Sequence, residues 1–244
     1  MFECPRSLAA ALLLSLAALL PAQAQEAQIR KTLAERLPQL PKIDEVTRTP
    51  VAGLWEVRYG GMELLYSDDK GDFILINGSM IDTKTRTDLT EARTEKLLAV
   101  DFNKLPLKDA MVFRQGKGSR KMAVFGDPNC GYCKRFEADV AALKDVTVYL
   151  FLVPILGPDS QVKSRDIWCA KDAPKAWRSW MLEGVAPPKA ADKCDASVLE
   201  RNVAFARTHR ITGTPTVFFE DGVRKPGAIP GDLVEKLLVA AAKK

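Results

Sequence analysis

The chain has 244 residues, of which 47% are hydrophobic and 27% charged, and its formal net charge is +5. Lysines and arginines are scattered among acidic residues and form no run longer than three, so this charge does not indicate nucleic-acid binding. Beyond the N-terminus, no segment is long and apolar enough to cross a bilayer. The length exceeds that of one small domain and predicts two.

Residues 1–24 have the pattern of a secretory signal peptide. Arg6 precedes an unbroken run of small and apolar residues at 8–20, and Ala22-Gln23-Ala24 offers an Ala-x-Ala cleavage site. A membrane anchor is the alternative, but the run is shorter than the ~20 residues that span a bilayer. Export predicts a compartment in which disulfides persist, and Cys4 would be removed with the signal.

Residues 25–87 are expected to form a small α+β domain. A short helix at 27–37 would precede a meander of three strands. So small a meander has little core and leaves backbone groups unpaired at its edges, and dimerisation through it would remedy both. The strand candidates are 54–59, 62–66 and 73–76.

Residues 88–104 are expected to form a linker helix. Asp88 and Glu91 have the spacing of a helix N-cap and its capping-box acid, and helix-favouring residues follow to about Asn103. The alternative is that this helix is an ordinary first helix of the second domain.

Residues 105–244 read as a thioredoxin-like α/β domain. The expected order is a short helix, a strand, a helix, a strand, a long helical stretch, a further helix, a hairpin and a final helix, which is the thioredoxin order with an inserted helical subdomain. Trp168, Trp177 and Trp180 fall in the insertion, where packing is the default role and substrate contact the alternative. After the short helix, the elements lie at 121–125, 130–140, 146–153, 160–182, 195–207, 216–225 and 232–242.

Cys130-Gly131-Tyr132-Cys133 places two thiols one helical turn apart, directly after the strand at 121–125. The turn-forming residues 126–129 precede the pair, so Cys130 is expected at the N-terminus of the following helix. There, unpaired N–H groups and the helix macrodipole favour a thiolate. We therefore expect Cys130 to be the exposed, attacking sulfur and Cys133 its shielded partner.

A Cys-x-x-Cys motif is alternatively half of a zinc site, which needs four ligands. The chain has no second such motif and a single histidine, so a zinc site would need Cys169 and Cys194. Redox chemistry is therefore favoured, with no metal or cofactor. In an oxidising compartment Cys169 and Cys194 would instead form a structural disulfide worth about 3 kcal/mol, although either could be a free thiol.

Gly213-Thr214-Pro215-Thr216 is the second informative motif. Proline suits only the margin of a strand, and X-Pro bonds account for essentially all cis peptides. A cis Pro215 would present the Thr214 backbone to an extended substrate segment beside the thiols. A trans proline that merely starts a strand is the alternative.

Taken together, these features resemble the DsbC/DsbG family of bacterial periplasmic thiol:disulfide interchange proteins. The resemblance covers essentially the whole mature chain. Beyond the signal peptide, meander and linker helix, it is carried by residues 125–133, 167–172, Cys194 and Gly213-Thr214-Pro215.

The resemblance implies a V-shaped periplasmic homodimer, joined by its N-terminal domains, that isomerises or reduces wrong disulfides in misfolded periplasmic proteins and acts as a chaperone. The inner-membrane reductase DsbD would keep it reduced. Within the motifs, it implies that Cys130 is the nucleophile and Cys133 the resolving thiol, with Thr214-Pro215 as the cis-proline loop and Cys169–Cys194 as a non-catalytic bridge.

Two details of the motif bear on the alternatives within this family. Gly131-Tyr132 is the DsbC dipeptide, whereas DsbG has Pro-Tyr, and Lys134 stands where DsbC has a histidine. The rival functions are a DsbG-like reductase of oxidised cysteines, an oxidising DsbA-type enzyme and a non-catalytic holdase chaperone. The extra N-terminal domain and the threonine before Pro215 disfavour the DsbA type.

Overall fold

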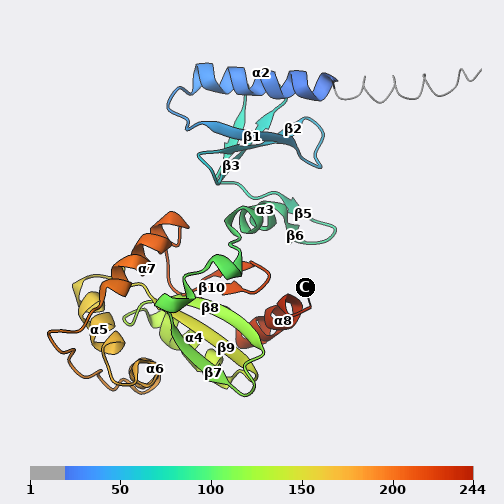
Figure 1. Cartoon of the computed structure of the whole chain (residues 1–244). Helices are drawn as coiled ribbons and strands as arrows, with labels where there is room; N and C mark the ends of the chain where they lie inside the picture. The colour runs from blue at the N-terminus through green and yellow to red at the C-terminus, as the bar shows by residue number, and fades with distance from the viewer. Residues whose placement is uncertain (1–19, 244) are drawn as a thin grey trace, which may run out of the picture. The chain divides into compact units, whose positions relative to one another are not determined.

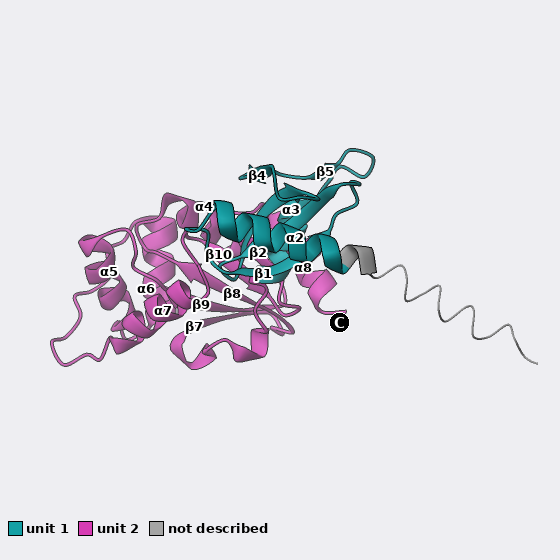
Figure 2. Cartoon of the chain, turned by 90° about the horizontal axis from the view of Figure 1, so that it is seen from above, with its two compact units in different colours: residues 1–97 teal, residues 98–244 magenta. Residues whose placement is uncertain are grey.

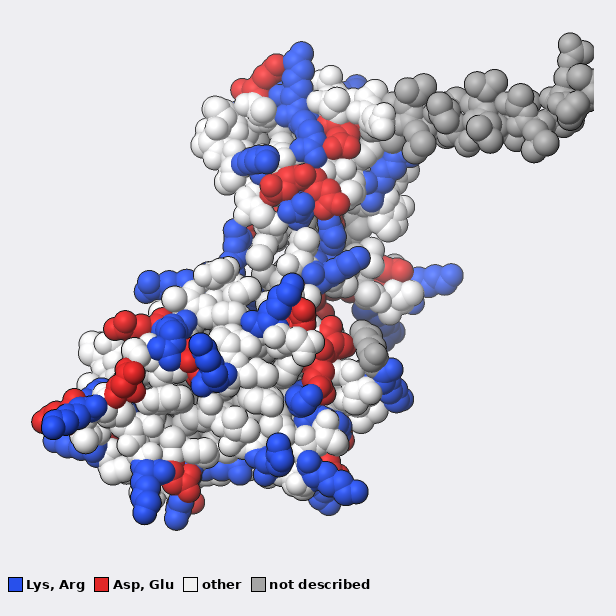
Figure 3. Space-filling model, viewed as in Figure 1, with Lys and Arg blue, Asp and Glu red and all other residues white. Residues whose placement is uncertain are grey.

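A computed structural model describes residues 20–243. The chain divides into two compact units, with the boundary in the sequence between Leu97 and Leu98 (Figure 2). The predicted signal peptide, residues 1–24, lies almost wholly outside the described residues. No helix among residues 20–243 is long and apolar enough to span a membrane. On the face drawn in Figure 3, lysines and arginines are interspersed with acidic residues.

The first unit packs one helix against an antiparallel sheet (Figure 1). Ile29 and Leu33, one helical turn apart, are both buried against Val57 and other apolar sheet residues, so the helix buries a single face. The elements are α2 (Leu20–Arg36), β1 (Ile43–Arg48), β2 (Leu54–Tyr59), β3 (Glu63–Asp68) and β4 (Ile74–Ile76), and the four strands lie in this order.

The first helix and the larger sheet of this unit differ from the prediction. The helix begins at Leu20 rather than at 27. The sheet has four strands rather than three, because β1 was not predicted. Only Val46 of β1 is buried, so the segment lacks the apolar alternation that predicts a strand. It forms a strand because it pairs with β2, where Val46 lies opposite Val57.

The predicted linker helix is shorter than 88–104. A small hairpin of β5 (Ile81–Asp82) and β6 (Thr87–Asp88) leads into α3 (Leu89–Leu98). The Asp88 carboxylate accepts from the Glu91 N–H at 2.9 Å, as the capping motif predicts. Arg93 ties α3 to the sheet of the first unit, since its guanidinium donates to Glu56 at 2.8 Å and to Glu45 at 2.6 Å.

The second unit is built on a five-stranded sheet in the order β11-β10-β8-β9-β7. Strands β8 and β9 are parallel and the other neighbours antiparallel. The strands are β7 (Met111–Gln115), β8 (Arg120–Gly126), β9 (Val146–Leu152), β10 (Thr216–Phe219) and β11 (Arg224–Pro226). The helices are α4 (Gly131–Ala142), α5 (Pro158–Trp168), α6 (Ala173–Arg178), a π-helical turn (Ser179–Glu183), α7 (Ser197–Thr208) and α8 (Gly231–Ala241), with 3-10 turns at Phe102–Lys104 and Leu107–Asp109.

Both faces of the central strands are buried. Along β8, Val124 faces a core that includes Phe136 of α4 and Leu238 of α8. Phe125 faces the opposite core, where its ring stacks on Phe151 with centroids 4.5 Å apart. This two-sided burial explains why the central strands read as continuous apolar runs in the sequence.

Two predictions for this unit were wrong in detail. Strand β7 was not predicted; it is a five-residue edge strand that pairs with β9 alone. The helical stretch at 160–182 is not continuous, since α5 ends at Trp168 and α6 begins anew at Ala173. The Asp172 side chain caps α6 by accepting from the Lys175 N–H at 3.0 Å.

Candidate active site

The two thiols of the Cys-x-x-Cys motif lie at the start of α4, as predicted. Cys130 is the N-cap residue, and its sulfur accepts from the Cys133 N–H at 3.3 Å. The Lys134 N–H donates to the Cys130 carbonyl, which closes the first turn of the helix. Both cysteines are free thiols in this structure. The pair can therefore supply both the attacking sulfur and the sulfur that resolves a mixed disulfide.

The expected difference in exposure between the two thiols is wrong. Cys130 is only 6% exposed and Cys133 3%, so both are buried. The Thr214 carbonyl covers Cys130, whose thiol donates to it at 3.1 Å. Gly131 and Tyr132 between them are exposed, with Tyr132 at 60%. The motif is therefore open to solvent at the Gly131-Tyr132 pair.

The Thr214–Pro215 peptide bond is cis. The sheet explains how this loop reaches a thiol 84 residues earlier in the chain: β10 is antiparallel to β8, and Thr216 lies opposite Phe125. The residues before β10 therefore lie beside those that follow β8, which lead to Cys130. A bond from the Thr216 hydroxyl to the Gly213 carbonyl, at 2.8 Å, holds the loop.

Cys133 is held in its thiol form. Burial raises the pKa of Cys133 well above the usual value of a cysteine, and the neighbouring Cys130 sulfur raises it further. Hydrogen bonds with the Asp127 backbone and the Thr214 side chain act in the opposite direction, but burial is the larger effect. The second cysteine is thus shielded electrostatically as well as sterically.

Asp127 organises the turn before Cys130, a role that the sequence did not reveal. Its carboxylate is fully buried and accepts four hydrogen bonds, so its charge is well compensated. The donors are the N–H groups of Asn129 (2.8 Å), Ile155 (2.9 Å) and Leu156 (3.0 Å) and the Ser160 hydroxyl (2.7 Å). The carboxylate thereby ties the Cys-x-x-Cys turn to the loop that enters α5. The only sequence signal for this role is an acidic residue directly after an apolar strand, and that pattern also fits an ordinary turn.

Trp180 also supports this turn. The sequence predicts that Trp180 packs in the core, and its ring does so. Its indole N–H also donates to the Pro128 carbonyl at 2.6 Å. The ammonium groups of Lys134 and Lys163 lie 4.2 and 4.1 Å from the centroid of the same ring. Lys163 further donates to the Asn129 side chain at 2.8 Å. The insertion is therefore part of the active-site scaffold.

A buried carboxylate joins α4 to the insertion. Glu137 accepts from the Trp177 indole N–H at 2.8 Å and from the Arg178 guanidinium at 3.2 Å. Burial raises the pKa of Glu137, although both of these donors lower it. The Trp177 side chain is 1% exposed, which agrees with the packing role expected for it.

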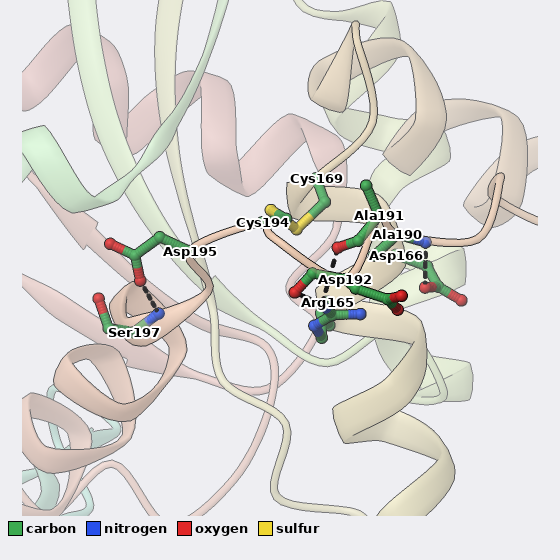
Figure 4. Close-up of a disulfide and its surroundings, with 9 residues drawn as sticks. All are labelled: Arg165, Asp166, Cys169, Ala190, Ala191, Asp192, Cys194, Asp195 and Ser197. Carbon is green, nitrogen blue, oxygen red and sulfur yellow. Dashed lines mark hydrogen bonds between the residues drawn. A yellow bond between two sulfur atoms is a disulfide. The ribbon is translucent and has the colours of Figure 1, made fainter.

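Cys169 and Cys194 form a disulfide with a Cα separation of 6.1 Å. It links the end of α5 to the segment that leads into α7 (Figure 4). The same segment is bonded to α5 twice more: Arg165 donates to the Ala191 carbonyl at 2.9 Å, and Asp166 accepts from the Ala190 N–H at 2.8 Å. The bridge thus belongs to a structural tether. Within residues 20–243, no group of three or more His, Cys, Asp or Glu side chains could hold a metal ion.

Comparison with known proteins identifies the family of each unit. The model of the disulfide bond isomerase protein N-terminal domain matches residues 20–91, and that of the thioredoxin-like domain matches residues 107–242. The probable thiol:disulfide interchange protein DsbC of Bordetella parapertussis is 48% identical over 196 residues, which cover 80% of this chain and 68% of the relative. The thiol:disulfide interchange protein DsbC of Escherichia coli is 32% identical over 223 residues, which cover 89% of each chain.

A solved structure supports the same assignment. The disulfide interchange protein from Neisseria gonorrhoeae superimposes with a TM-score of 0.54 at 34% identity, covering 57% of this chain and all of that one. Together with the family matches, it confirms the predicted α+β N-terminal domain followed by a thioredoxin-like domain. The chain therefore belongs to the DsbC family of thiol:disulfide interchange proteins, and it is a thiol–disulfide oxidoreductase.

Proposed function

We propose that this protein is a periplasmic disulfide isomerase in which Cys130 attacks wrong disulfides of secreted client proteins. The observation that carries the proposal is the setting of Cys130, whose sulfur meets the Cys133 N–H at 3.3 Å and the Thr214 carbonyl at 3.1 Å. Cys130 thus stands at the start of α4 with its sulfur facing a backbone donor and the cis-proline loop, the place of the attacking sulfur of the pair.

The reaction begins when the Cys130 thiolate attacks one sulfur of a client disulfide. A bond forms between Cys130 and that sulfur, the client S–S bond breaks, and the second client sulfur leaves as a thiolate. Another client thiolate then displaces Cys130 and forms a new client disulfide. This cycle rearranges a disulfide without net oxidation or reduction.

Cys133 provides the escape from a mixed disulfide that no client thiol resolves. Once deprotonated, it attacks Cys130, forms the Cys130–Cys133 disulfide and releases the client as a dithiol, two electrons richer. Because burial raises the pKa of Cys133, this step is slow, and client thiols gain time to react first. The escape consumes reducing equivalents, and we assign their resupply to the inner-membrane reductase DsbD.

Thr214, Pro215, Gly131 and Tyr132 would bind the client around the attacked sulfur. Thr214 is half-buried, whereas Gly213, Gly131 and Tyr132 are exposed, so client atoms can reach this rim. An extended client segment can pair with the Thr214 backbone, which precedes the first residue of β10 that pairs with β8.

We further propose that the protein works as a homodimer joined through its first unit. Strand β4 is an edge of the sheet, and it exposes Leu75 at 59% and Ile76 at 48%. Phe73, just before it, is 78% exposed. Such an edge offers both unpaired backbone groups and apolar surface to a second copy. The cleft between two copies would supply the chaperone activity.

The test is the refolding of scrambled ribonuclease with catalytic amounts of the wild-type protein, Cys130→Ser and Cys133→Ser. We expect the wild type to restore ribonuclease activity, Cys130→Ser to be inactive and Cys133→Ser to retain part of the isomerisation. A Cys130→Ser variant that refolds the substrate as well as the wild type would favour the holdase alternative. Consumption of one reductant equivalent per client disulfide, without isomerisation, would favour a reductase.

Removal of residues 25–85 tests the dimer. The truncated protein should sediment as a monomer and still exchange simple disulfides, because Cys130, Cys133 and Thr214 all lie in the second unit. It should lose most isomerase and chaperone activity, since no cleft then retains a misfolded chain through several rounds of exchange. Full-length protein that sediments as a monomer at micromolar concentration, with isomerase activity intact, would contradict the dimer.

A further inference from the structure

We propose that the basic side chains at the start of α4 select client segments that carry acidic residues beside the attacked disulfide. This inference rests on the proposed function and adds a substrate class to it. The feature that carries it, called here the basic rim, consists of Lys134, Arg135 and Lys163 with the rings of Tyr132 and Trp180.

The basic rim is held in place beside the attacking sulfur. Lys134 is four residues after Cys130, on the next turn of the same helix face. Its ammonium lies 4.2 Å from the centroid of the Trp180 ring, and that ring is fixed by its hydrogen bond to the Pro128 carbonyl. The Arg135 guanidinium lies 4.6 Å from the centroid of the Tyr132 ring, within the motif itself. Cation–π contacts thus restrain both side chains near Cys130.

The charge of the rim is not neutralised within the protein. Lys163 pairs with Asp159 at 2.8 Å, but no ion pair of the described residues involves Lys134 or Arg135. Two acids of this part of the fold are buried and engaged: Asp127 by hydrogen-bond donors and Glu137 by Trp177 and Arg178. Asp139, four residues after Arg135 on α4, is exposed and forms no ion pair with another described residue. Two positive charges therefore remain free to meet an anion from outside.

The position of these cations is unfavourable for the helix alone. The first turn of α4 holds no acidic residue, and the two basic residues follow directly after it. A helix N-terminus is electropositive, so cations near it weaken the helix rather than stabilise it. Two anions could compensate them: the Cys130 thiolate, and a carboxylate of the client. The experiment below separates these two effects.

A client carboxylate can reach the rim from an extended segment. Residues of an extended chain are about 3.3 Å apart, so Asp or Glu within two residues of the half-cystine lies within about 7 Å of the attacked sulfur. A charge pair about 10 Å apart in water changes a rate about twofold. Each of two flanking acids in the client should therefore speed the attack about twofold, and each of two flanking lysines should slow it about twofold. Acidic and basic segments are thus expected to differ on the order of tenfold at low salt.

The test uses three peptides that differ only in the residues flanking one cysteine, which carry Glu, Gln or Lys on both sides. Each is joined through a disulfide to the same neutral fluorescent thiol, whose release reports the attack by Cys130. The proteins are the wild type, Lys134→Gln, Arg135→Gln, the double variant and Cys130→Ser. Lys144→Gln is the matched control, because Lys144 is exposed and follows α4 at the end opposite Cys130.

We expect the wild type to attack the Glu peptide about tenfold faster than the Lys peptide in 10 mM salt. The ratio should approach one in 1 M salt, where the Debye length is about 3 Å, and in the double variant, and it should be unchanged in Lys144→Gln. A ratio near one in the wild type, or an unchanged ratio in the double variant, would overturn the inference. If the double variant attacks all three peptides more slowly by one common factor, the rim acts only on the Cys130 thiolate, and the inference of client selection is overturned. Failure of the proposed function is distinct: the wild type would then not attack the Gln peptide at all.

Discussion

Replacing Asp127 by asparagine should strongly destabilise the second unit. Each carboxylate oxygen accepts two hydrogen bonds, Oδ1 from the Asn129 N–H and the Ser160 hydroxyl, and Oδ2 from the N–H groups of Ile155 and Leu156. An amide keeps the shape of the side chain, but its nitrogen cannot accept, so two buried donors lose their acceptor. Hydrogen bonds to a charged group contribute about 1.5–3 kcal/mol each, and the expected loss is about 4 kcal/mol.

Urea unfolding followed by tryptophan fluorescence measures this loss. Three tryptophans, Trp168, Trp177 and Trp180, report on the second unit, and a Trp55→Phe background silences the fourth, which lies in the first unit. With a slope of about 2 kcal/mol/M, the midpoint should fall by about 2 M. Asp159→Asn is the control, because its side chain is 73% exposed and its pair with Lys163 contributes little. A loss below about 1 kcal/mol for Asp127→Asn would refute the reasoning.

Three further predictions concern other groups of the second unit. Because burial raises the pKa of Glu137, its contribution to stability is fully present below the unfolded-state value of 4.5 and is lost as the pH rises through the folded-state pKa. Urea unfolding at a series of pH values should show that Glu137→Gln flattens this part of the stability curve, and identical curves for the variant and the wild type would contradict the argument. Iodoacetamide should label Cys130 well before Cys133, whose pKa burial raises, and mass mapping that finds Cys133 labelled first would reverse their roles. The Cys169–Cys194 disulfide should persist in mild dithiothreitol that opens Cys130–Cys133, and the double alanine variant should lose about 3 kcal/mol of stability; simultaneous reduction of both bridges would count against a purely structural one.

Local sequence patterns were sufficient to predict the structural features that depend on near neighbours in the chain. The Cys-x-x-Cys spacing and the turn before it predicted that Cys130 begins a helix, and α4 begins there. The apolar runs of β8, β9 and β10 predicted buried strands, because such strands bury both faces. The Asp221-Gly222 turn likewise predicted the hairpin of β10 and β11. Each of these features depends on residues within one short segment.

Two edge strands, β1 and β7, were not predicted from the sequence, whereas the edge strands β4 and β11 were. Strands β1 and β7 bury few side chains, and each is a strand because a partner supplies its hydrogen bonds. That information resides in the partner and not in the segment itself. The burial of Cys130 was mispredicted for a similar reason, since the carbonyl that covers it comes from Thr214.

By itself, then, the sequence determined the thiol pair, its place on a helix start, the central strands of the second unit and the family. Only the tertiary structure decided what surrounds the thiols: the Thr214 carbonyl, the buried Asp127 carboxylate, and the Trp180 ring with its two lysines. The physical reason is that helix starts and turns arise from interactions between near neighbours in the chain. Burial, ion pairing and the resulting pKa of Cys133 arise instead from segments that only the folded sheet brings together.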